Sequence, residues 1–181
     1  MKKQLKNILY RLRGDYTTEK LVSMGMRIGK NFKRLHGVIL DPGHCWLICI
    51  GNNVTLAPRV HVLCHDASTK QHLNYTKLGR VTIGDNVFIG ASAVILPGVS
   101  IGNDVIVGAN STVTQDIPSG MVFAGCPAKL VCSTEDYLTK ERVRMETAPC
   151  YDENYTLGGN ISSEQKQQQR DELKNSNGYV V

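Results

Sequence analysis

Pairs of cysteines spaced as C-x-x-C are missing from this sequence, although its 181 residues include six cysteines. No signal peptide precedes these cysteines, so we expect neither a disulfide framework nor a zinc ribbon. Thiols that stay reduced indicate a cytoplasmic protein.

Charge and hydrophobic length are also limited. The net charge of +5 is modest and is not gathered into a stripe with aromatic residues, which make up only 6% of the chain. Nucleic acid is therefore not expected as the main partner. The apolar run within the N-terminal stretch MKKQLKNILYRLRG is too short to span a bilayer. The length of the chain fits one sizeable core with appendages.

A six-residue spacing of aliphatic residues between Val81 and Thr114 is the dominant pattern. It fits neither the face of a helix nor the plain alternation of a half-buried strand. The first series is Ile83, Ile89, Ile95, Ile101, Val107 and Val113. A second series of apolar or small residues stands four places after members of the first: Val87, Ala93, Val99, Val105 and Ser111. The same phase returns upstream at Ile50, Leu56 and Val62.

Each repeat contains a short triplet such as Val87-Phe88-Ile89, whose outer side chains share one face while the middle one takes the other. The residues expected to point outward are Phe88, Val94, Ser100, Ile106 and Thr112. Turn formers such as Gly84-Asp85-Asn86 separate the triplets, so the chain turns a corner every six residues. Three sides close a coil, and stacked parallel coils bury the aliphatic stripe. An antiparallel meander would not keep one phase through six repeats.

The phase therefore predicts an all-β core, a parallel β-helix over residues 28–131. Residues 66–80 carry no hexapeptide phase and are interpreted as a polar loop that protrudes from it. Residues 1–27 are interpreted as an N-terminal helical cap, with a short helix over Thr17–Met24. Residues 132–181 are interpreted as a helical C-terminal extension, with helices that open near Ser133 and Ser162.

The two ends carry finer predictions. A basic amphipathic stripe at helical spacing is expected to cover the open end of the core, and contact with a membrane surface is the less favoured alternative. Its apolar residues are Leu5, Ile8, Leu9 and Leu12. The segment SSEQKQQQRDELKN is so polar that alone it would have little reason to order. The closing Gly-Tyr-Val-Val suggests a docked tail.

The side-chain directions in the strand before the protruding loop indicate which residues can meet a ligand. Alternation from Val60 places Val62 and Cys64 inward, and it places His61 and His65 outward. His65 stands at the base of the loop, where an imidazole could serve as a general base near neutral pH. Spacing alone does not separate this role from that of a surface histidine.

The stretch from Ile89 to Pro118, followed by Ala124-Gly-Cys-Pro-Ala-Lys129, resembles the hexapeptide-repeat O-acetyltransferases, which include sugar and antibiotic acetyltransferases. The H-D-A-S-T-K loop is most similar to capsule and lipopolysaccharide members. The resemblance covers about Arg27 to Val131. It implies a left-handed coil, a homotrimer, and acetyl-CoA in the groove between neighbouring subunits. The implied acceptor is a small sugar or a polysaccharide precursor, and no metal is implied.

The same resemblance assigns roles to individual residues. His65 matches the general base, and the backbone N–H near Ala91 matches the donor to the oxyanion. The positions that match coenzyme contacts are Phe88, Gly90, Ala91, Ala109, Thr114, Gln115 and Lys129. Many relatives have Lys where this chain has Gln115, so a cation expected near the phosphates is missing. Asp41 is a weak candidate for the partner that orients His65.

Three alternatives remain open from the sequence. Cys64 beside His65 could form a nucleophilic pair, although alternation buries the thiol. A zinc-dependent, carbonic-anhydrase-like hydratase could use His36, His61 and His65. A trimeric scaffold without catalysis is the third alternative.

Overall fold

The computed structural model describes residues 16–181. The predicted amphipathic stripe of Leu5, Ile8, Leu9 and Leu12 therefore lies outside the described residues. The chain divides into two compact units, Met1–Thr134 and Glu135–Val181. Within residues 16–181, no helix has the length and apolar character needed to cross a membrane.

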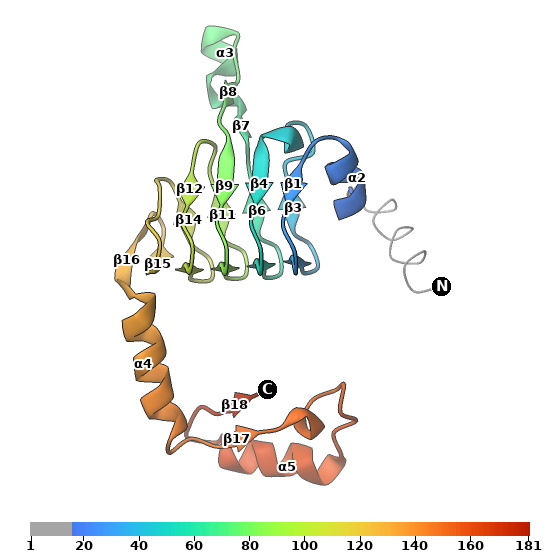
Figure 1. Ribbon diagram of the computed structural model, residues 1–181, viewed down its shortest axis with the longest axis vertical. Coiled ribbons are helices and arrows are strands. Elements are labelled where there is room, and N and C mark those ends of the chain that lie inside the picture. The colour runs from blue at the N-terminus through green and yellow to red at the C-terminus, as the bar shows by residue number, and fades with distance from the viewer. Residues whose placement is uncertain (1–15) are drawn as a thin grey trace. The chain divides into compact units, whose positions relative to one another are not determined.

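Short parallel strands build the first unit as three sheets (Figure 1). The first sheet contains β1 (Arg27–Ile28), β4 (Ile48–Ile50), β9 (Val81–Ile83) and β12 (Ser100–Ile101). The second sheet contains β2 (Lys33–Arg34), β5 (Thr55–Leu56), β10 (Phe88–Ile89), β13 (Ile106–Val107), β15 (Met121–Gly125) and β16 (Ala128–Ser133). The third sheet contains β3 (Ile39–Leu40), β6 (His61–Val62), β11 (Val94–Ile95) and β14 (Thr112–Val113).

The chain visits the three sheets in turn, and each strand pairs with the strand one coil later. In the regular part, Phe88 is in register with Ile106 and Val94 with Thr112, each pair parallel. The hydrogen bond between Asp85 and Asn103 spans 18 residues, which is three repeats of six. Bonds between earlier coils span 22 and 33 residues, because these coils carry insertions. Parallel strands in register agree with the stacking that the sequence predicts.

The interior is the predicted aliphatic stripe. The inward residues of both series are buried, from Ile89 at 0% to Ile101 at 3% relative exposure. Burial of each large aliphatic side chain contributes roughly 1.5–3 kcal/mol to the free energy of folding. Ser111 is also fully buried, and its hydroxyl accepts a hydrogen bond from the Gly125 N–H at 3.0 Å. The predicted inward and outward directions are therefore confirmed.

The corner between the first and second sheets is held by a ladder of side-chain amides. Asn31, Asn53, Asn86 and Asp104 occupy it in successive coils, each with φ between 55° and 57°. The amide of Asn31 donates to Asn53, Asn53 to Asn86, and Asn86 to the Asp104 carboxylate, at 2.9–3.0 Å. Asn and Asp tolerate the left-handed region better than other residues with a side chain. This tolerance explains their recurrence at this corner.

Both ends of the first unit are covered by other elements. Helix α2 (Thr18–Ser23), capped by the Thr17 hydroxyl, buries Leu21 against the core. At the other end β15 and β16 form an antiparallel hairpin. Residues 121–131 were predicted to continue the parallel coil, and the antiparallel pairing of β15 with β16 corrects this prediction. The chain reverses between Gly125 and Ala128, and β16 therefore closes the edge of the second sheet.

The protruding segment leaves between the third and first sheets (Figure 1). It comprises β7 (His65–Asp66), η2 (Ala67–Thr69), α3 (Lys70–Leu73) and β8 (Lys77–Leu78). Strands β7 and β8 pair antiparallel, with His65 opposite Leu78. Asp66 accepts a hydrogen bond from the Ser68 N–H at 2.9 Å and pairs with Lys77 at 3.0 Å. These contacts hold the base of the loop in a fixed geometry.

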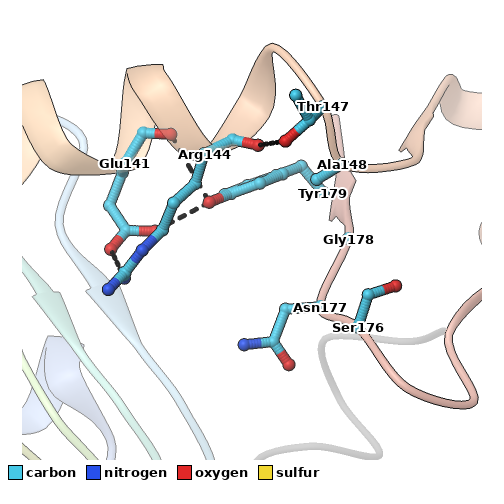
Figure 2. A pocket seen from close by; sticks show the side chains of 8 residues that line it. All are labelled: Glu141, Arg144, Thr147, Ala148, Ser176, Asn177, Gly178 and Tyr179. Atoms are coloured by element: carbon cyan, nitrogen blue, oxygen red, sulfur yellow. Dashed lines mark hydrogen bonds and ion pairs between the residues drawn. The ribbon is translucent and has the colours of Figure 1, made fainter.

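The second unit contains α4 (Thr134–Met145), β17 (Cys150–Tyr151), η3 (Glu153–Tyr155), α5 (Ser163–Glu172) and β18 (Tyr179–Val180). The capping box of Ser162 and Gln165 is present, so the predicted helix start near Ser162 is confirmed. Strand β18 pairs with β17, so the predicted docked tail is confirmed as well. The polar segment forms α5, and Tyr151 donates a hydrogen bond to Glu172 of this helix at 2.8 Å. A pocket of about 310 Å³ lies between Arg144 and Asn177, and Tyr179 bonds Glu141 at its edge (Figure 2).

Candidate active site

Two insertions interrupt the repeat: residues 41–47 after β3 and the protruding segment after β6. Both leave the coil at the corner between the third and first sheets. Strands β3 and β6 are neighbours, with Leu40 in register with Val62. The first insertion begins at Asp41 after β3, and the second begins shortly after β6. Asp41 is consequently placed beside Cys64 and His65, although 24 residues separate Asp41 from His65 in sequence.

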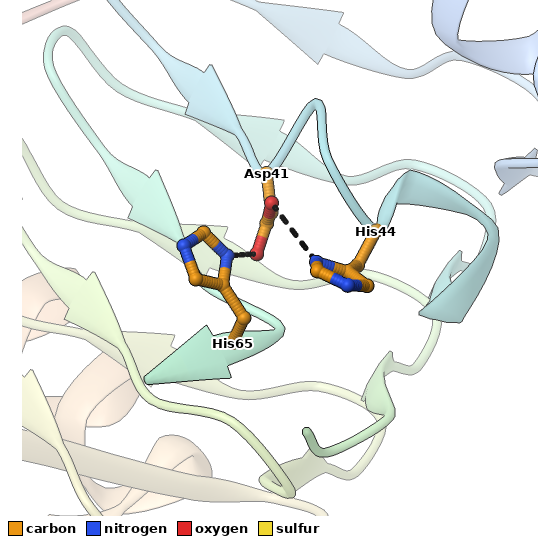
Figure 3. A group of neighbouring side chains, drawn as sticks. All are labelled: Asp41, His44 and His65. Atoms are coloured by element: carbon orange, nitrogen blue, oxygen red, sulfur yellow. Dashed lines mark hydrogen bonds and ion pairs between the residues drawn. The ribbon is translucent and has the colours of Figure 1, made fainter. Parts of the chain in front are cut away.

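Asp41 is a buried carboxylate that accepts hydrogen bonds from several donors. Its relative exposure is 1%. Oδ2 accepts a hydrogen bond from the Cys64 N–H at 2.8 Å and lies 2.5 Å from Nδ1 of His65 (Figure 3). Oδ1 accepts from the Gly43 N–H at 3.2 Å. Two backbone donors therefore fix the carboxylate independently of the histidine.

These donors determine the charge of Asp41. Burial by itself raises the pKa of a carboxyl group, but here the Cys64 N–H, the His65 ring and the nearby histidines more than offset it. The pKa of Asp41 is lowered below its usual value. The group is ionised at neutral pH, so Nδ1 of His65 must carry the proton in their contact. This tautomer, assigned from the network, leaves Nε2 of His65 able to accept a proton.

A second histidine faces the same carboxylate. Nδ1 of His44 lies 4.0 Å from Asp41 Oδ1, and within residues 16–181 this buried nitrogen has no hydrogen-bond partner. The ring of His44 lies 5.3 Å from that of His65 and 5.4 Å from that of Trp46, centroid to centroid. Trp46, the single tryptophan, is 52% exposed. His44 and Trp46 were not predicted from the sequence, because both lie in an insertion outside the repeat.

The predicted outward direction of His65 is confirmed, since 41% of its side chain is exposed, whereas Cys64 is fully buried. Burial, with the Asp41 charge nearby, raises the pKa of the Cys64 thiol to about 11. A protonated, buried thiol is a poor nucleophile. This environment argues against the alternative of catalysis by Cys64.

The predicted coenzyme residues occupy other parts of the first unit. Ala91 and Ala109 lie at the corner between the second and third sheets, one coil apart, and Ala91 accepts from the Asn110 N–H at 2.8 Å. Within the described chain neither the Ala91 N–H nor the Ala109 N–H donates a hydrogen bond to protein. Gly90 is buried, and a Cβ there would come within 2.5 Å of the Ala109 nitrogen. Only glycine allows these corners to stack so closely.

The other predicted positions are all exposed. Phe88, 46% exposed, stands on the outer face of the second sheet beside Ile106. Thr114 follows β14, two strands along the third sheet from Leu63. At the usual strand spacing, Thr114 is therefore about 10 Å from Leu63, which precedes the protruding segment. Gln115 follows Thr114, and Lys129 lies in β16 opposite Ala124.

A single chain does not bring all these residues together. His65 lies at the corner between the third and first sheets. Ala91 and Ala109 lie at the corner between the second and third sheets. The histidines of the zinc alternative are not grouped either. Within residues 16–181, the group of metal-ligating side chains is Asp41, His44 and His65, without His36 or His61. The zinc alternative with His36 and His61 is therefore wrong in its ligands.

Comparison with known proteins identifies the family of this chain. The family described as bacterial transferase hexapeptide (six repeats) matches residues 80–115. Protein CapG of Staphylococcus aureus is 39% identical over 134 residues, which cover 71% of this chain and 78% of CapG. The chain belongs to the hexapeptide-repeat acetyltransferase family. The predicted family and enzyme class, an acyltransferase, are thereby confirmed.

Solved structures of hexapeptide-repeat acetyltransferases agree. A maltose O-acetyltransferase from Clostridium difficile 630 is 35% identical, with a TM-score of 0.53, over 60% of this chain and 59% of that one. A hexapeptide-repeat acetyltransferase from Vibrio cholerae, complexed with acetyl coenzyme A, is 31% identical, with a TM-score of 0.55, over 61% of each chain. The chain thus spans about three-fifths of these two solved relatives.

Proposed function

We propose that this hexapeptide-repeat acetyltransferase moves an acetyl group from acetyl-CoA to a hydroxyl of a sugar or polysaccharide-linked acceptor. The observation that carries the proposal is the contact between Asp41 and His65 at the base of the protruding loop. The complex of the Vibrio relative with acetyl coenzyme A supports the donor. The same relatives support a left-handed coil for the parallel sheets.

His65 acts as the general base. Asp41 holds the ring by Nδ1–H, so Nε2 accepts the proton of the acceptor hydroxyl while that oxygen attacks the thioester carbonyl. The Asp41 carboxylate also stabilises the imidazolium that forms when His65 takes this proton. The proton then passes from His65 to the departing thiolate of coenzyme A. Transfer is direct, without an acyl-enzyme.

The oxyanion that develops on the carbonyl needs a nearby donor. The N–H groups of Ala91 and Ala109 are free to donate. Because His65 lies at a different corner of its own chain, we infer that these donors come from a neighbouring subunit. The site is then shared, and a homotrimer of this chain supplies three such sites.

Coenzyme binding follows from the same arrangement. The exposed ring of Phe88 offers an apolar wall beside the corner of Gly90, Ala91 and Ala109. Thr114 and Gln115 follow β14 in the third sheet, two strands from Leu63 near the base of the loop. Lys129 offers a cation for the phosphates. All but Gly90 and Ala91 are exposed, which a groove between subunits requires.

The acceptor site is formed by the surface around His65. Trp46 presents a half-exposed ring next to His44, and Tyr75, farther along the loop, is 79% exposed. A pyranose has a face of C–H groups that packs on such rings, and aromatic side chains bury large apolar areas. This chemistry, together with the maltose acetyltransferase relative, supports a sugar acceptor.

Acetyl transfer to a panel of sugars, followed with labelled acetyl-CoA, tests the proposal. Titration of the single tryptophan by fluorescence reports acceptor binding beside the site in the same samples. We expect transfer to at least one pyranoside that also changes the Trp46 emission. Binding of coenzyme A without transfer to any hydroxyl acceptor would favour the scaffold alternative. The cytoplasmic location and the division at residues 27 and 131 remain predictions.

A further inference from the structure

Three metal-ligating side chains meet at the base of the protruding loop. One donor atom each from Asp41, His44 and His65 lie within 4.8 Å of one another (Figure 3). The proposed transfer reaction uses Asp41 and His65, but it gives His44 no task. Nδ1 of His44 is nonetheless turned toward the carboxylate, buried and without a hydrogen-bond partner among the described residues.

We propose that Asp41, His44 and His65 form a binding site for a divalent transition-metal ion of the Zn²⁺ type, and that a bound ion blocks acetyl transfer. The binding itself is independent of the proposed function, whereas the block rests on it. Two imidazole nitrogens and one carboxylate oxygen form a donor set that suits Zn²⁺ and its neighbours.

The spacing of the donors is close to what such an ion requires. Ligand bonds of about 2.0–2.2 Å in a tetrahedron place donor atoms roughly 3.3 Å apart. The contact of Asp41 Oδ2 with His65 Nδ1 at 2.5 Å and that of Asp41 Oδ1 with His44 Nδ1 at 4.0 Å lie on either side of this value. A small outward shift of one ring and an inward shift of the other would accommodate the ion.

The surroundings favour a cation and leave room for a fourth ligand. Asp41 is fully buried, and the Gly43 and Cys64 N–H groups orient its carboxylate. Such outer contacts hold ligands in place in metal sites. The side chains of His44 and His65 are 28% and 41% exposed, so water can reach the ion.

The block follows from the tautomer of His65. In the metal-free site the proton is on Nδ1 and Nε2 is the base. An ion on Nδ1 leaves the neutral ring with its proton on Nε2, so no proton is released and Nε2 can no longer accept one. The ion also displaces Asp41 from its contact with the ring.

Calorimetric titration of ZnCl₂ into the full chain, stripped with EDTA and dialysed, tests the binding. We expect one Zn²⁺ per chain for the wild type and at least tenfold weaker binding for His44→Gln. The matched control is His61→Gln, which removes another outward histidine and should bind as the wild type does. Circular dichroism checks that each variant folds, and His44→Asn replaces His44→Gln if that variant does not.

A second readout uses the single tryptophan. Cu²⁺ quenches a nearby indole, so it should quench Trp46 in the wild type and much less in His44→Gln. Unchanged Zn²⁺ affinity in the His44 variant, or no binding to the wild type, would overturn the site. If Zn²⁺ binds but transfer continues unaffected, the block is wrong. If metal-free protein transfers no acetyl group while Zn²⁺ still binds, the proposed function fails and the metal site stands.

Discussion

Asp41 Oδ2 lies 2.5 Å from Nδ1 of His65, across 24 residues of sequence. Two parallel strands, β3 and β6, produce this proximity, and both of their coils open at the same corner. The carboxylate is held by backbone N–H groups on both oxygens, so its position does not depend on the histidine. The proposed chemistry depends on this arrangement, because it fixes the tautomer of His65 at the base of the loop.

Asp41→Asn should lower turnover by roughly a hundredfold or more, the scale of losing a positioned general base. The neutral amide would no longer stabilise the imidazolium that forms when His65 takes a proton. Kinetics measures the loss of turnover, and the ¹⁵N shifts of the His65 ring report its protonation state. Asp66→Asn is the control, because Asp66 pairs with Lys77 instead. Equal losses in the two variants would contradict a specific role for Asp41.

Cys64→Ala should keep most of the activity. Because the pKa of this buried thiol is raised to about 11, it remains protonated at pH 8 and gains thiolate only as the pH approaches that value. Iodoacetamide at pH 8 should therefore modify the exposed Cys126 and leave Cys64 unmodified in the folded protein. Mass spectrometry maps both products. An acetyl adduct on Cys64 during turnover would refute direct transfer.

Mixed oligomers test whether sites are shared between subunits. His65→Ala removes the base, and Ala109→Trp places a bulky group at the exposed coenzyme corner. Each variant alone should be nearly inactive. Random 1:1 mixing should restore about a quarter of the wild-type rate, because one site in four combines an intact His65 with an intact Ala109. No recovery would show that each site lies within one chain.

Asn53→Ala should lower the free energy of unfolding by about 1 kcal/mol more than Asn53→Gly. Both changes remove the hydrogen bonds to Asn31 and Asn86, but only glycine adopts a φ of 55° without steric cost. Chemical denaturation at one protein concentration compares them. A less stable glycine variant would mean that the left-handed backbone at this corner is not the main requirement.

The sequence was sufficient for the core and for the direction of His65. Each buried position from Ile83 to Val113 follows from a spacing that only a three-sided coil satisfies. Asp41 could be named only as a weak candidate, because its register with Cys64 depends on the length of the first insertion. His44 and Trp46 lie inside that insertion, where no period constrains them. The hairpin of β15 and β16 was missed because the coil was extended to residue 131, although Ser119 and Gly125 stand where the six-residue series would continue.

The most direct test of the account compares His65→Ala with His61→Ala. Both histidines point outward, but His61 lies on the face of the third sheet, between Ile39 and Val94, away from Asp41. Asp41 keeps its two backbone hydrogen bonds in the His65 variant, so folding and coenzyme A binding should persist. The account predicts that kcat for acetyl transfer falls by roughly a hundredfold or more in His65→Ala and stays near the wild-type value in His61→Ala. Wild-type turnover by His65→Ala, or the larger loss in His61→Ala, would contradict it.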